Sequence, residues 1–373
     1  MDILLVNWQD LENPQAGGAE LHLFEIFSRL ASRGHRIRLV CSGWTGAACE
    51  VQLSGIDVTR VGGRLSFALL ARGAVRAALR ARRPDIVVED VNKLPLMLPT
   101  LSRLPFCAIV PHLFGTTAFE EVNWPMAATV WLSERPLARV YRRAGFHAIS
   151  ESTRDDLVAR GVRPGAIRVI HPGVDAERLR PGPPGSRAPA PQFVYVGRLR
   201  RYKGVDVALR ALALARATRP DLTLDIAGTG NHRAELEQLA IELGLADAVR
   251  FHGFVSEAQK IDLFQRAWAN LFPSPKEGWG ITVIEAAACG TPSIASDSPG
   301  LRDSVRDGET GFLVRHGDVD ALAARMLELA DHPARLAALG TAARRFAEGL
   351  TWERTASKTE RHLQDIIAGS GAA

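Results

Sequence analysis

Two glutamates stand eight positions apart in the segment SPKEGWGITVIEAAACGTP, residues 274–292 of this 373-residue chain. The apolar run between them predicts a short buried helix that starts after Gly280 and ends before Gly290. If all eight steps were helical, Glu277 and Glu285 would lie about 12 Å apart, at roughly 1.5 Å per residue. That exceeds the roughly 5 to 9.5 Å between the carboxyl groups of glycoside hydrolases, so a hydrolytic pair is disfavoured.

A ligand with hydroxyl groups at both ends and a diphosphate between them suits this spacing. One carboxylate can hold the hydroxyls of a sugar while the other holds those of a ribose. The backbone N–H groups of Gly280, Ile281 and Thr282 lie at the predicted helix start, where the helix dipole favours an anion. A salt-bridged or solvated pair of glutamates is the alternative, but it leaves the flanking glycines and the apolar helix unexplained.

Two other segments carry groups that suit the same ligand. In VYVGRLRRYKG, Arg198 and Lys203 flank a predicted strand-to-helix turn, and their cations suit a diphosphate. Solvated loop cations are the alternative. In VRFHGFVS, the exposed backbone at Phe254 and Val255 could pair with a base edge, or could be a plain strand-to-loop junction.

The first domain offers two weaker candidates. Gly17 and Gly18 precede a predicted helix, where their backbone could approach an anion or could form an ordinary tight turn. They are not part of a GxGxxG sequence, so the dinucleotide fingerprint is absent. His112 follows an apolar strand that Pro111 ends, and ligands bind beyond such carboxyl ends in open α/β sheets. By itself, a lone histidine is more often structural.

No pattern in the sequence predicts a bound metal. The D-x-D pair Asp318 and Asp320 is better interpreted as a helix cap than as a metal site. The four cysteines show neither CxxC nor paired histidine spacing, which argues against a zinc site and a disulfide framework and fits a reducing compartment.

The alternation of short β-branched runs with longer helical patterns predicts α/β architecture with parallel sheets. A proline- and glycine-rich break, LRPGPPGSRAPAPQ, interrupts this alternation. We therefore expect two Rossmann-like, doubly wound domains at residues 1–178 and 192–350, with a linker at 179–191. Residues 351–373 are expected to form a C-terminal helix and tail that could pack back on the first domain.

The net charge of +5 and the pI near 9.3 come from arginines spread along the chain, with a denser group between Arg72 and Arg83. No aromatic-interleaved basic patch accompanies them, so nucleic acid is not an expected partner. The chain has no run of about 18 apolar residues, and MDILLVNWQD is typical of a first strand rather than a signal peptide. A cytoplasmic location is expected. The basic segment LLARGAVRAALRARRP is interpreted either as a peripheral contact with the inner membrane face or as a solvated helix face.

Six motifs together resemble a known family, the retaining glycosyltransferases of family 4, which have the two-domain GT-B fold. They are GGAE at 17–20, SEST at 150–153, HPGVD at 171–175, GRLRRYKG at 197–204, HGFV at 252–255 and EGWGITVIEAAACGTP at 277–292. The last is similar to the family's E-x7-E signature, with Trp279 where phenylalanine is common. The resemblance covers nearly the whole chain and implies two Rossmann-like domains that face a cleft.

The resemblance also implies roles for the second-domain residues. Glu285 would bind the ribose, Glu277 would hold the transferred sugar, and Arg198 with Lys203 would neutralise the departing diphosphate. The family is metal-independent, and two fixed cations would take the place of a magnesium ion. No cofactor is therefore expected beyond the nucleotide-sugar donor.

In the first domain, the resemblance implies that Gly17 and Gly18 approach the phosphates and that His112 faces the sugar. The acceptor segments do not match a known pattern; Lys93, Glu120 and Glu121 are candidate acceptor contacts or simple loop charges.

The implied activity is retaining transfer of a hexose or related sugar to a hydroxyl of a glycan, lipid-linked or small-molecule acceptor. The alternatives are a nucleotide-sugar epimerase or hydrolase of the same architecture, and a binding subunit without turnover.

Overall fold

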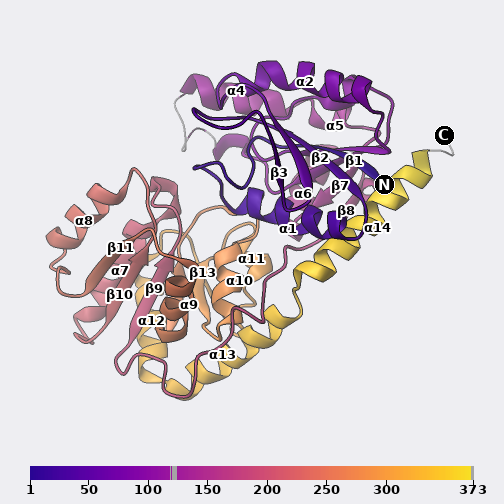
Figure 1. Cartoon of the computed structure of the whole chain (residues 1–373). Helices are drawn as coiled ribbons and strands as arrows, with labels where there is room; N and C mark the ends of the chain where they lie inside the picture. The colour runs from indigo at the N-terminus through magenta and orange to yellow at the C-terminus, as the bar shows by residue number, and fades with distance from the viewer. Residues whose placement is uncertain (118, 120–123, 371–373) are drawn as a thin grey trace. The chain divides into compact units, whose positions relative to one another are not determined.

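A computed structural model describes all residues of the chain except 118, 120–123 and 371–373 (Figure 1). The chain forms two compact units. Unit 1 comprises Met1–Gly173 and Trp352–Ala373, and unit 2 comprises Val174–Thr351. The proline-rich residues 179–191 belong to unit 2, where the Arg187 guanidinium donates to the carbonyls of Ala267 and Gly290, each at 2.8 Å. Among the described helices, none is long and apolar enough to cross a membrane.

The sheet of unit 1 has the strand order β3-β4-β2-β1-β5-β6-β7-β8 in the described residues, and all neighbours are parallel except β3 and β4. Its strands are β1 (Asp2–Val6), β2 (Arg36–Cys41), β3 (Glu50–Leu53), β4 (Ile56–Arg60), β5 (Ile86–Asp90), β6 (Phe106–Val110), β7 (Gly145–Ala148) and β8 (Ile167–Val169). The strands β2 to β4 that follow β1 lie on one side of it in the sheet, and β5 and the later strands lie on its other side. The switch point of the sheet, where open α/β sheets bind ligands, therefore lies between the carboxyl ends of β1 and β5.

Helices cover both faces of this sheet. They are α1 (Gly18–Ser32), α2 (Phe67–Ala81), α4 (Trp124–Glu134), α5 (Leu137–Val140), α6 (Glu151–Ala159) and α14 (Trp352–Ser370), with short 3-10 turns at Leu98–Thr100, Gly115–Thr117 and Pro164–Ala166. Because side chains alternate along a strand, Leu4 and Val6 of β1 pack with α2, whereas Ile3 and Leu5 pack with α1 and α14. This double covering is why β1 and β6, in the middle of the sheet, are almost continuously apolar.

Unit 2 repeats the plan with a fully parallel sheet in the order β11-β10-β9-β12-β13-β14. Its strands are β9 (Gln192–Val196), β10 (Thr223–Ala227), β11 (Val249–Gly253), β12 (Ala269–Phe272), β13 (Ser293–Ser296) and β14 (Gly311–Val314). Its helices are α7 (Val205–Arg216), α8 (Arg233–Glu242), α9 (Glu257–Arg266), α10 (Ile281–Ala288), α11 (Leu301–Ser304), α12 (Val319–Asp331) and α13 (Pro333–Glu348), with a 3-10 turn at Arg201–Lys203. The switch point lies between β9 and β12.

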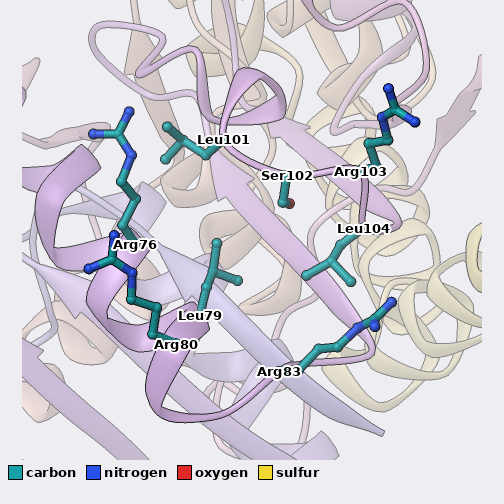
Figure 2. Close-up of a pocket in the computed structure, with 8 residues that line it drawn as sticks. All are labelled: Arg76, Leu79, Arg80, Arg83, Leu101, Ser102, Arg103 and Leu104. Atoms are coloured by element: carbon teal, nitrogen blue, oxygen red, sulfur yellow. The ribbon is translucent and has the colours of Figure 1, made fainter.

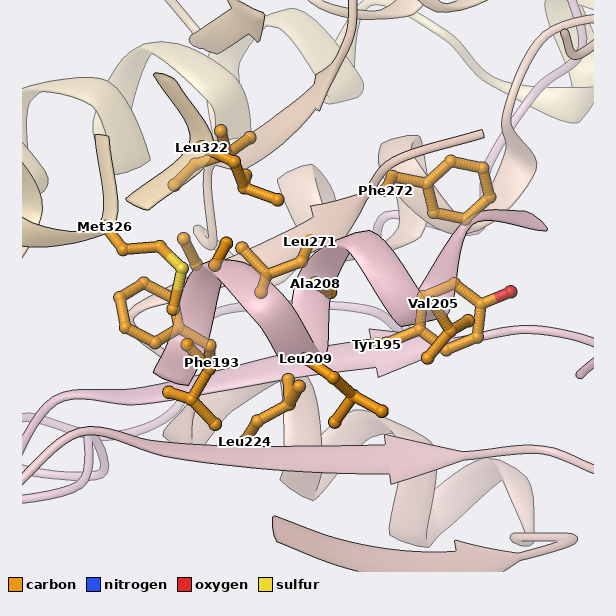
Figure 3. Close-up of a cluster of buried hydrophobic side chains, with 14 of the residues drawn as sticks. Phe193, Tyr195, Val205, Ala208, Leu209, Leu224, Leu271, Phe272, Leu322 and Met326 are labelled. Atoms are coloured by element: carbon orange, nitrogen blue, oxygen red, sulfur yellow. The ribbon is translucent and has the colours of Figure 1, made fainter. Parts of the chain in front are cut away.

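The core of unit 2 lies between the sheet and its helices. Figure 3 shows Phe193 and Tyr195 of β9 beside Leu209 of α7 and Met326 of α12, all of them fully buried. Burial of such a side chain contributes about 1.5–3 kcal/mol, so this core holds β9 and β12 firmly in place. Two parallel-sheet domains confirm the prediction of an α/β fold with two Rossmann-like halves.

The C-terminal helix α14 belongs to unit 1 and runs along α1 (Figure 1). Ala356 and Leu363 join the core beneath it. At its edge, Glu360 accepts from His35 at 2.6 Å and also pairs with Arg33. The final helix of the sequence is therefore part of the first domain's core.

Three buried histidines lie beside α14, namely His22 of α1, His147 of β7 and His362 of α14. The His22 and His147 ring centroids are 5.5 Å apart. Burial lowers the pKa of His22 from 6.5 to about 4, and burial likewise lowers the pKa of His362 to about 4. The unfolded chain binds these protons near pH 6.5 and the folded chain does not, so their stabilising effect is lost as the pH falls from 6.5 towards 4.

We predict that His22→Phe makes unit 1 less sensitive to acid. Because burial raises the pKa of Glu89 to about 7, that carboxyl has the opposite effect, and the variant must be compared with the parent at each pH. Relative to the parent, His22→Phe should gain up to about 3 kcal/mol between neutral pH and pH 4. Native-state hydrogen exchange of the β1 and β5 amides measures this gain. The exposed His332→Gln should show no such gain, and parallel pH curves for His22→Phe and the parent would contradict the prediction.

Candidate active site

The switch point of unit 2 brings together two of the loops that the sequence singled out. The loop after β9 carries Arg198 and Lys203, and the loop after β12 carries Glu277. These two strands pair directly in the sheet, so both loops begin at neighbouring carboxyl ends. Chain topology therefore brings together two motifs that lie more than seventy residues apart in the sequence.

Lys203 and Glu277 form an ion pair across this point, with the Lys203 Nζ donating to Glu277 Oε1. Both side chains are mostly buried, with relative exposures of 13% and 15%. Burial, the largest single effect, would lower the pKa of Lys203, but the charge and hydrogen bond of Glu277 together with those of Tyr202 raise that pKa overall. Lys203 is therefore held as a cation in a fixed position, with the rings of Tyr202 and Phe272 within 4.9 and 5.7 Å of its Nζ.

The segment between the two glutamates is only partly helical. Gly280 adopts φ +88°, and α10 begins at Ile281, as the sequence predicted. Only four of the eight steps are helical, so the condition behind the 12 Å estimate is not met and Glu277 lies in the preceding loop. The intrahelical hydrogen bonds begin with the N–H groups of Val283 and Ile284, which donate to the Gly280 carbonyl. The N–H groups of Ile281 and Thr282 therefore precede this ladder at the positive end of the helix dipole.

Glu285 lies one turn into α10 and is buried. Burial raises the pKa of Glu285 above its usual value. The Lys260 Nζ, which donates to Glu285 Oε1 at 2.7 Å, offsets part of this rise. Lys260 comes from α9 and also contacts Glu257 at 2.9 Å. The sequence patterns did not single out Lys260. A signal was present in SEAQK, where Ser256 and Gln259 form a capping box. This capping box fixes the start of α9 and places Lys260 in its first turn.

The other predicted second-domain residues lie at the same carboxyl edge of the sheet. The Arg198 side chain is exposed, and its carbonyl accepts a hydrogen bond from the Tyr195 hydroxyl at 3.1 Å. Phe254 and Val255 directly follow β11, and Phe254 is 85% exposed. The structure thus gives unit 2 one buried cation, one exposed cation and a helix start along one edge.

In unit 1, Gly17 and Gly18 stand where β1 leads into α1. The Gly17 N–H donates to Glu20 Oε2 at 2.8 Å, so Glu20 caps the start of α1. His112 lies two residues beyond β6, where its ring meets that of Phe114 at 4.7 Å between centroids. Both candidates lie at the carboxyl edge of the unit 1 sheet.

Lys93 lies three residues after β5, with its Nζ 5.7 Å from the Trp8 ring. Glu120 and Glu121 lie outside the described residues. Sequence reasoning missed Asp90, which ends β5 and is 2% exposed; neither of its carboxyl oxygens has a hydrogen-bond partner among the described residues. Burial, reinforced by Glu20, raises the pKa of Asp90 well above its usual range.

Asn92 connects the two strands of the unit 1 switch point. Its Nδ2 donates to Asn7 Oδ1 at 2.9 Å, and Asn7 directly follows β1. Asp318 caps α12 by accepting from the Ala321 N–H at 2.9 Å, which confirms the interpretation of its D-x-D pair as a cap. In the part of the chain that the structure describes, no three His, Cys, Asp or Glu side chains form a group suited to a metal ion.

Gly300, at φ +79°, packs its Cα directly against the carbonyl of Glu277 and the backbone of Gly278. We predict that Gly300→Ala displaces this loop and costs about 3 kcal/mol or more, because a Cβ cannot share this space. The matched control is Gly317→Ala, at φ +78° in open space, which should cost only the roughly 1–2 kcal/mol of a left-handed residue. Urea unfolding measures both variants, and hydrogen exchange of residues 274–280 detects the loop. Equal losses in the two variants would show that the close approach has no effect.

Comparison with known proteins agrees with this geometry. Residues 16–178 match the family described as "Glycosyltransferase Family 4", and residues 181–346 match "Glycosyl transferases group 1". A D-inositol 3-phosphate glycosyltransferase of Streptomyces griseus is 37% identical and aligns over 96% of this chain and 87% of its own length. A protein of the same name from Streptomyces avermitilis is 39% identical over 52% of this chain. That match covers 46%, or about half, of the relative's own length.

Solved structures resemble the fold over its whole length. Sucrose-phosphate synthase from Thermosynechococcus elongatus aligns with a TM-score of 0.83 and 23% identity over 99% of both chains. The Anabaena protein HepE, in complex with UDP and glucose, aligns with a TM-score of 0.79 and 20% identity over 98% of this chain and all of its own. With both halves matched and a relative aligned almost end to end, the chain belongs to glycosyltransferase family 4 and has the GT-B fold.

Proposed function

We propose that this chain transfers a hexose or related sugar from a nucleoside-diphosphate sugar to an acceptor hydroxyl, with retention of the anomeric configuration. The ion pair between Lys203 and Glu277 at the unit 2 switch point carries this proposal. A buried cation and a buried carboxylate at one carboxyl edge suit the two parts of such a donor, its diphosphate and its sugar hydroxyls.

The positive charges of unit 2 indicate where the diphosphate of the donor would lie. The diphosphate would lie at the start of α10, near Ile281 and Thr282, with Lys203 and the exposed Arg198 supplying positive charge. Glu277 would exchange its contact with Lys203 for the sugar hydroxyls. Glu285, whose Oε1 already accepts from Lys260, would hold the ribose with its remaining acceptor capacity.

The chemical step would then depend on the leaving group. As the bond between the anomeric carbon and the phosphate oxygen breaks, negative charge develops on that oxygen. Lys203 and Arg198 would stabilise this charge, in place of a metal ion, without moving during the step. The acceptor oxygen would attack the same face of the anomeric carbon, which gives retention, and its proton would pass to the departing phosphate oxygen.

The acceptor is proposed to be a polyol, with inositol 3-phosphate the first to be tested because the relative aligned almost end to end is named for it. Asp90 supports a polyol. Because burial and Glu20 raise its pKa, its carboxyl would be neutral and could both donate to and accept from a hydroxyl. Lys93, three residues further along, would supply positive charge for a phosphate group.

The first test is a thermal-shift screen against UDP, GDP, ADP and their sugar conjugates. A nucleotide present at 100 times its dissociation constant should stabilise the folded state by about 2.7 kcal/mol. The control is Glu285→Gln rather than Glu285→Ala, because glutamine can still accept from Lys260, which alanine would leave buried and unpaired. Selective stabilisation that is reduced in Glu285→Gln is expected. No shift with any nucleotide would remove the main support for the donor assignment and would favour a degenerate, non-catalytic chain.

The second test uses the ion pair. Lys203→Gln should lower kcat/KM about 10²- to 10³-fold, as removal of a preorganised charge-stabilising donor does. Each single change, Lys203→Gln or Glu277→Gln, leaves a buried charge unpaired, so the double variant should be more stable than the two single losses predict. Lys358→Gln, on α14, is the control for loss of a lysine.

The products of the same assay separate the competing activities. Transfer to the acceptor with retained configuration, undiminished by EDTA, is expected. An inverted product would overturn the proposed mechanism. A sugar released or epimerised equally well without acceptor would indicate the hydrolase or epimerase instead.

A further inference from the structure

Some of the arginines around helix α2 have structural partners. Arg72 donates to the carbonyls of Leu96 and Met97 at 3.0 and 2.8 Å, and Arg82 donates to Asp2 at 2.7 Å. Four other arginines in the same region differ from these two. Within the described residues, their guanidinium groups make no hydrogen bond and no ion pair. They are Arg76, Arg80, Arg83 and Arg103.

These four arginines line one surface pocket of about 540 Å³ (Figure 2). They stand around its edge, and Leu79, Leu101, Ser102 and Leu104 complete the lining. None of these eight residues, all in the described part of the chain, is acidic. The pocket therefore combines an apolar floor with an uncompensated cationic rim.

A pocket in unit 2 shows a surface on which the charges are balanced. It lies in unit 2, and its lining includes Arg201 and Arg210 together with Asp206, Glu235 and Glu242. Its cations have carboxylates beside them. The arginine-rich pocket of unit 1 has none in its lining, so a high arginine content does not by itself explain it.

The pocket lies away from the substrate edge of unit 1. Arg80 and Arg83 are at the end of α2, just before β5 begins at Ile86, and Arg103 precedes β6 at Phe106. They are therefore at the amino ends of β5 and β6. Gly17 and His112 follow the carboxyl ends of β1 and β6, so the pocket is separate from the proposed donor and acceptor positions.

The exposed face of α2 extends the pocket with apolar residues. Leu69, Gly73, Arg76 and Arg80 follow one another at steps of four, three and four residues, which places them on one stripe of the helix. Leu69 is 83% exposed, and Leu65, in the turn before the helix, is 85% exposed. Large apolar side chains at this exposure next to unpaired arginines are typical of a surface that lies on lipid headgroups.

We propose that unit 1 binds the surface of an anionic membrane through α2. The lipid phosphates would occupy the rim formed by Arg76, Arg80, Arg83 and Arg103, and Leu65 and Leu69 would enter the headgroup region. The four guanidinium groups supply the charge that recognises phosphate, and the apolar floor accommodates the carbon atoms next to it. A free phosphate would use the rim but would leave both exposed leucines without a role, and for that reason the lipid surface is favoured.

The test is co-sedimentation of the full-length protein with phosphatidylcholine vesicles that contain or lack phosphatidylglycerol. The parent protein should bind only the anionic vesicles, and added salt should release it because the attraction is screened. The triple variant R76E/R80E/R83E should bind at least about tenfold more weakly, since each basic residue near the surface contributes appreciably. The variant Leu69→Ser should bind about threefold or more weakly at unchanged charge.

A matched control reverses three exposed arginines elsewhere: R168E/R210E/R361E has the same net charge as the first triple variant. It should bind the anionic vesicles almost as well as the parent does. That result would show that binding depends on the α2 surface and not on the net charge of the protein. Equal binding by the two triple variants, or parent binding to neutral vesicles alone, would overturn the proposal. Thermal stabilisation by inorganic phosphate, lost in R76E/R80E/R83E and without vesicle binding, would also overturn it and would identify a free anion as the ligand.

Discussion

A buried lysine requires a carboxylate, and this requirement determines the geometry of unit 2. Moving an ammonium group out of water costs several kcal/mol unless an opposite charge compensates it. Lys203 and Lys260 are both 13% exposed, and each is paired with one glutamate of the E-x7-E segment, Glu277 or Glu285. The two pairs connect the loop after β12 to the turn before α7, and α10 to α9. The segment between the glutamates is therefore held at both ends by charge.

The sheet makes this pairing possible. Because β9 and β12 are neighbours at the switch point, the loops that follow them meet without any long excursion of the chain. Gly300 lets the loop of Glu277 pass close by, and Gly280 provides the positive φ with which that loop turns into α10. The charges thus depend on the backbone, and the backbone depends on a core whose strands are buried on both faces.

Sequence patterns predicted the elements well because period and composition are local properties. The two parallel sheets, the helix after Gly280 and the caps at Glu20 and Asp318 all follow from residues within a few positions of each other. Lys260 and Asp90 could not be found in this way. Lys260 reaches Glu285 from another helix, and the environment of Asp90 depends on how β1, β5 and α1 pack. The estimate of about 12 Å between Glu277 and Glu285 required eight helical steps. The structure has α10 begin only at Ile281, four residues after Glu277.

The two switch points differ in their electrostatics, and this difference bears on which substrate each unit takes. In unit 2, Lys203 and Lys260 each have their own carboxylate, so Lys203 can bind a diphosphate fully only by giving up its contact with Glu277. Such an exchange favours ligands that bring hydroxyls for the carboxylate as well as charge for the lysine. In unit 1, burial of Asp90 raises its pKa well above the usual range, and a neutral carboxyl group pairs with hydroxyls rather than with cations. On the proposed function, the two edges therefore offer different groups: unit 2 offers a buried cation for a diphosphate, and unit 1 offers a neutral carboxyl group for the hydroxyls of an acceptor.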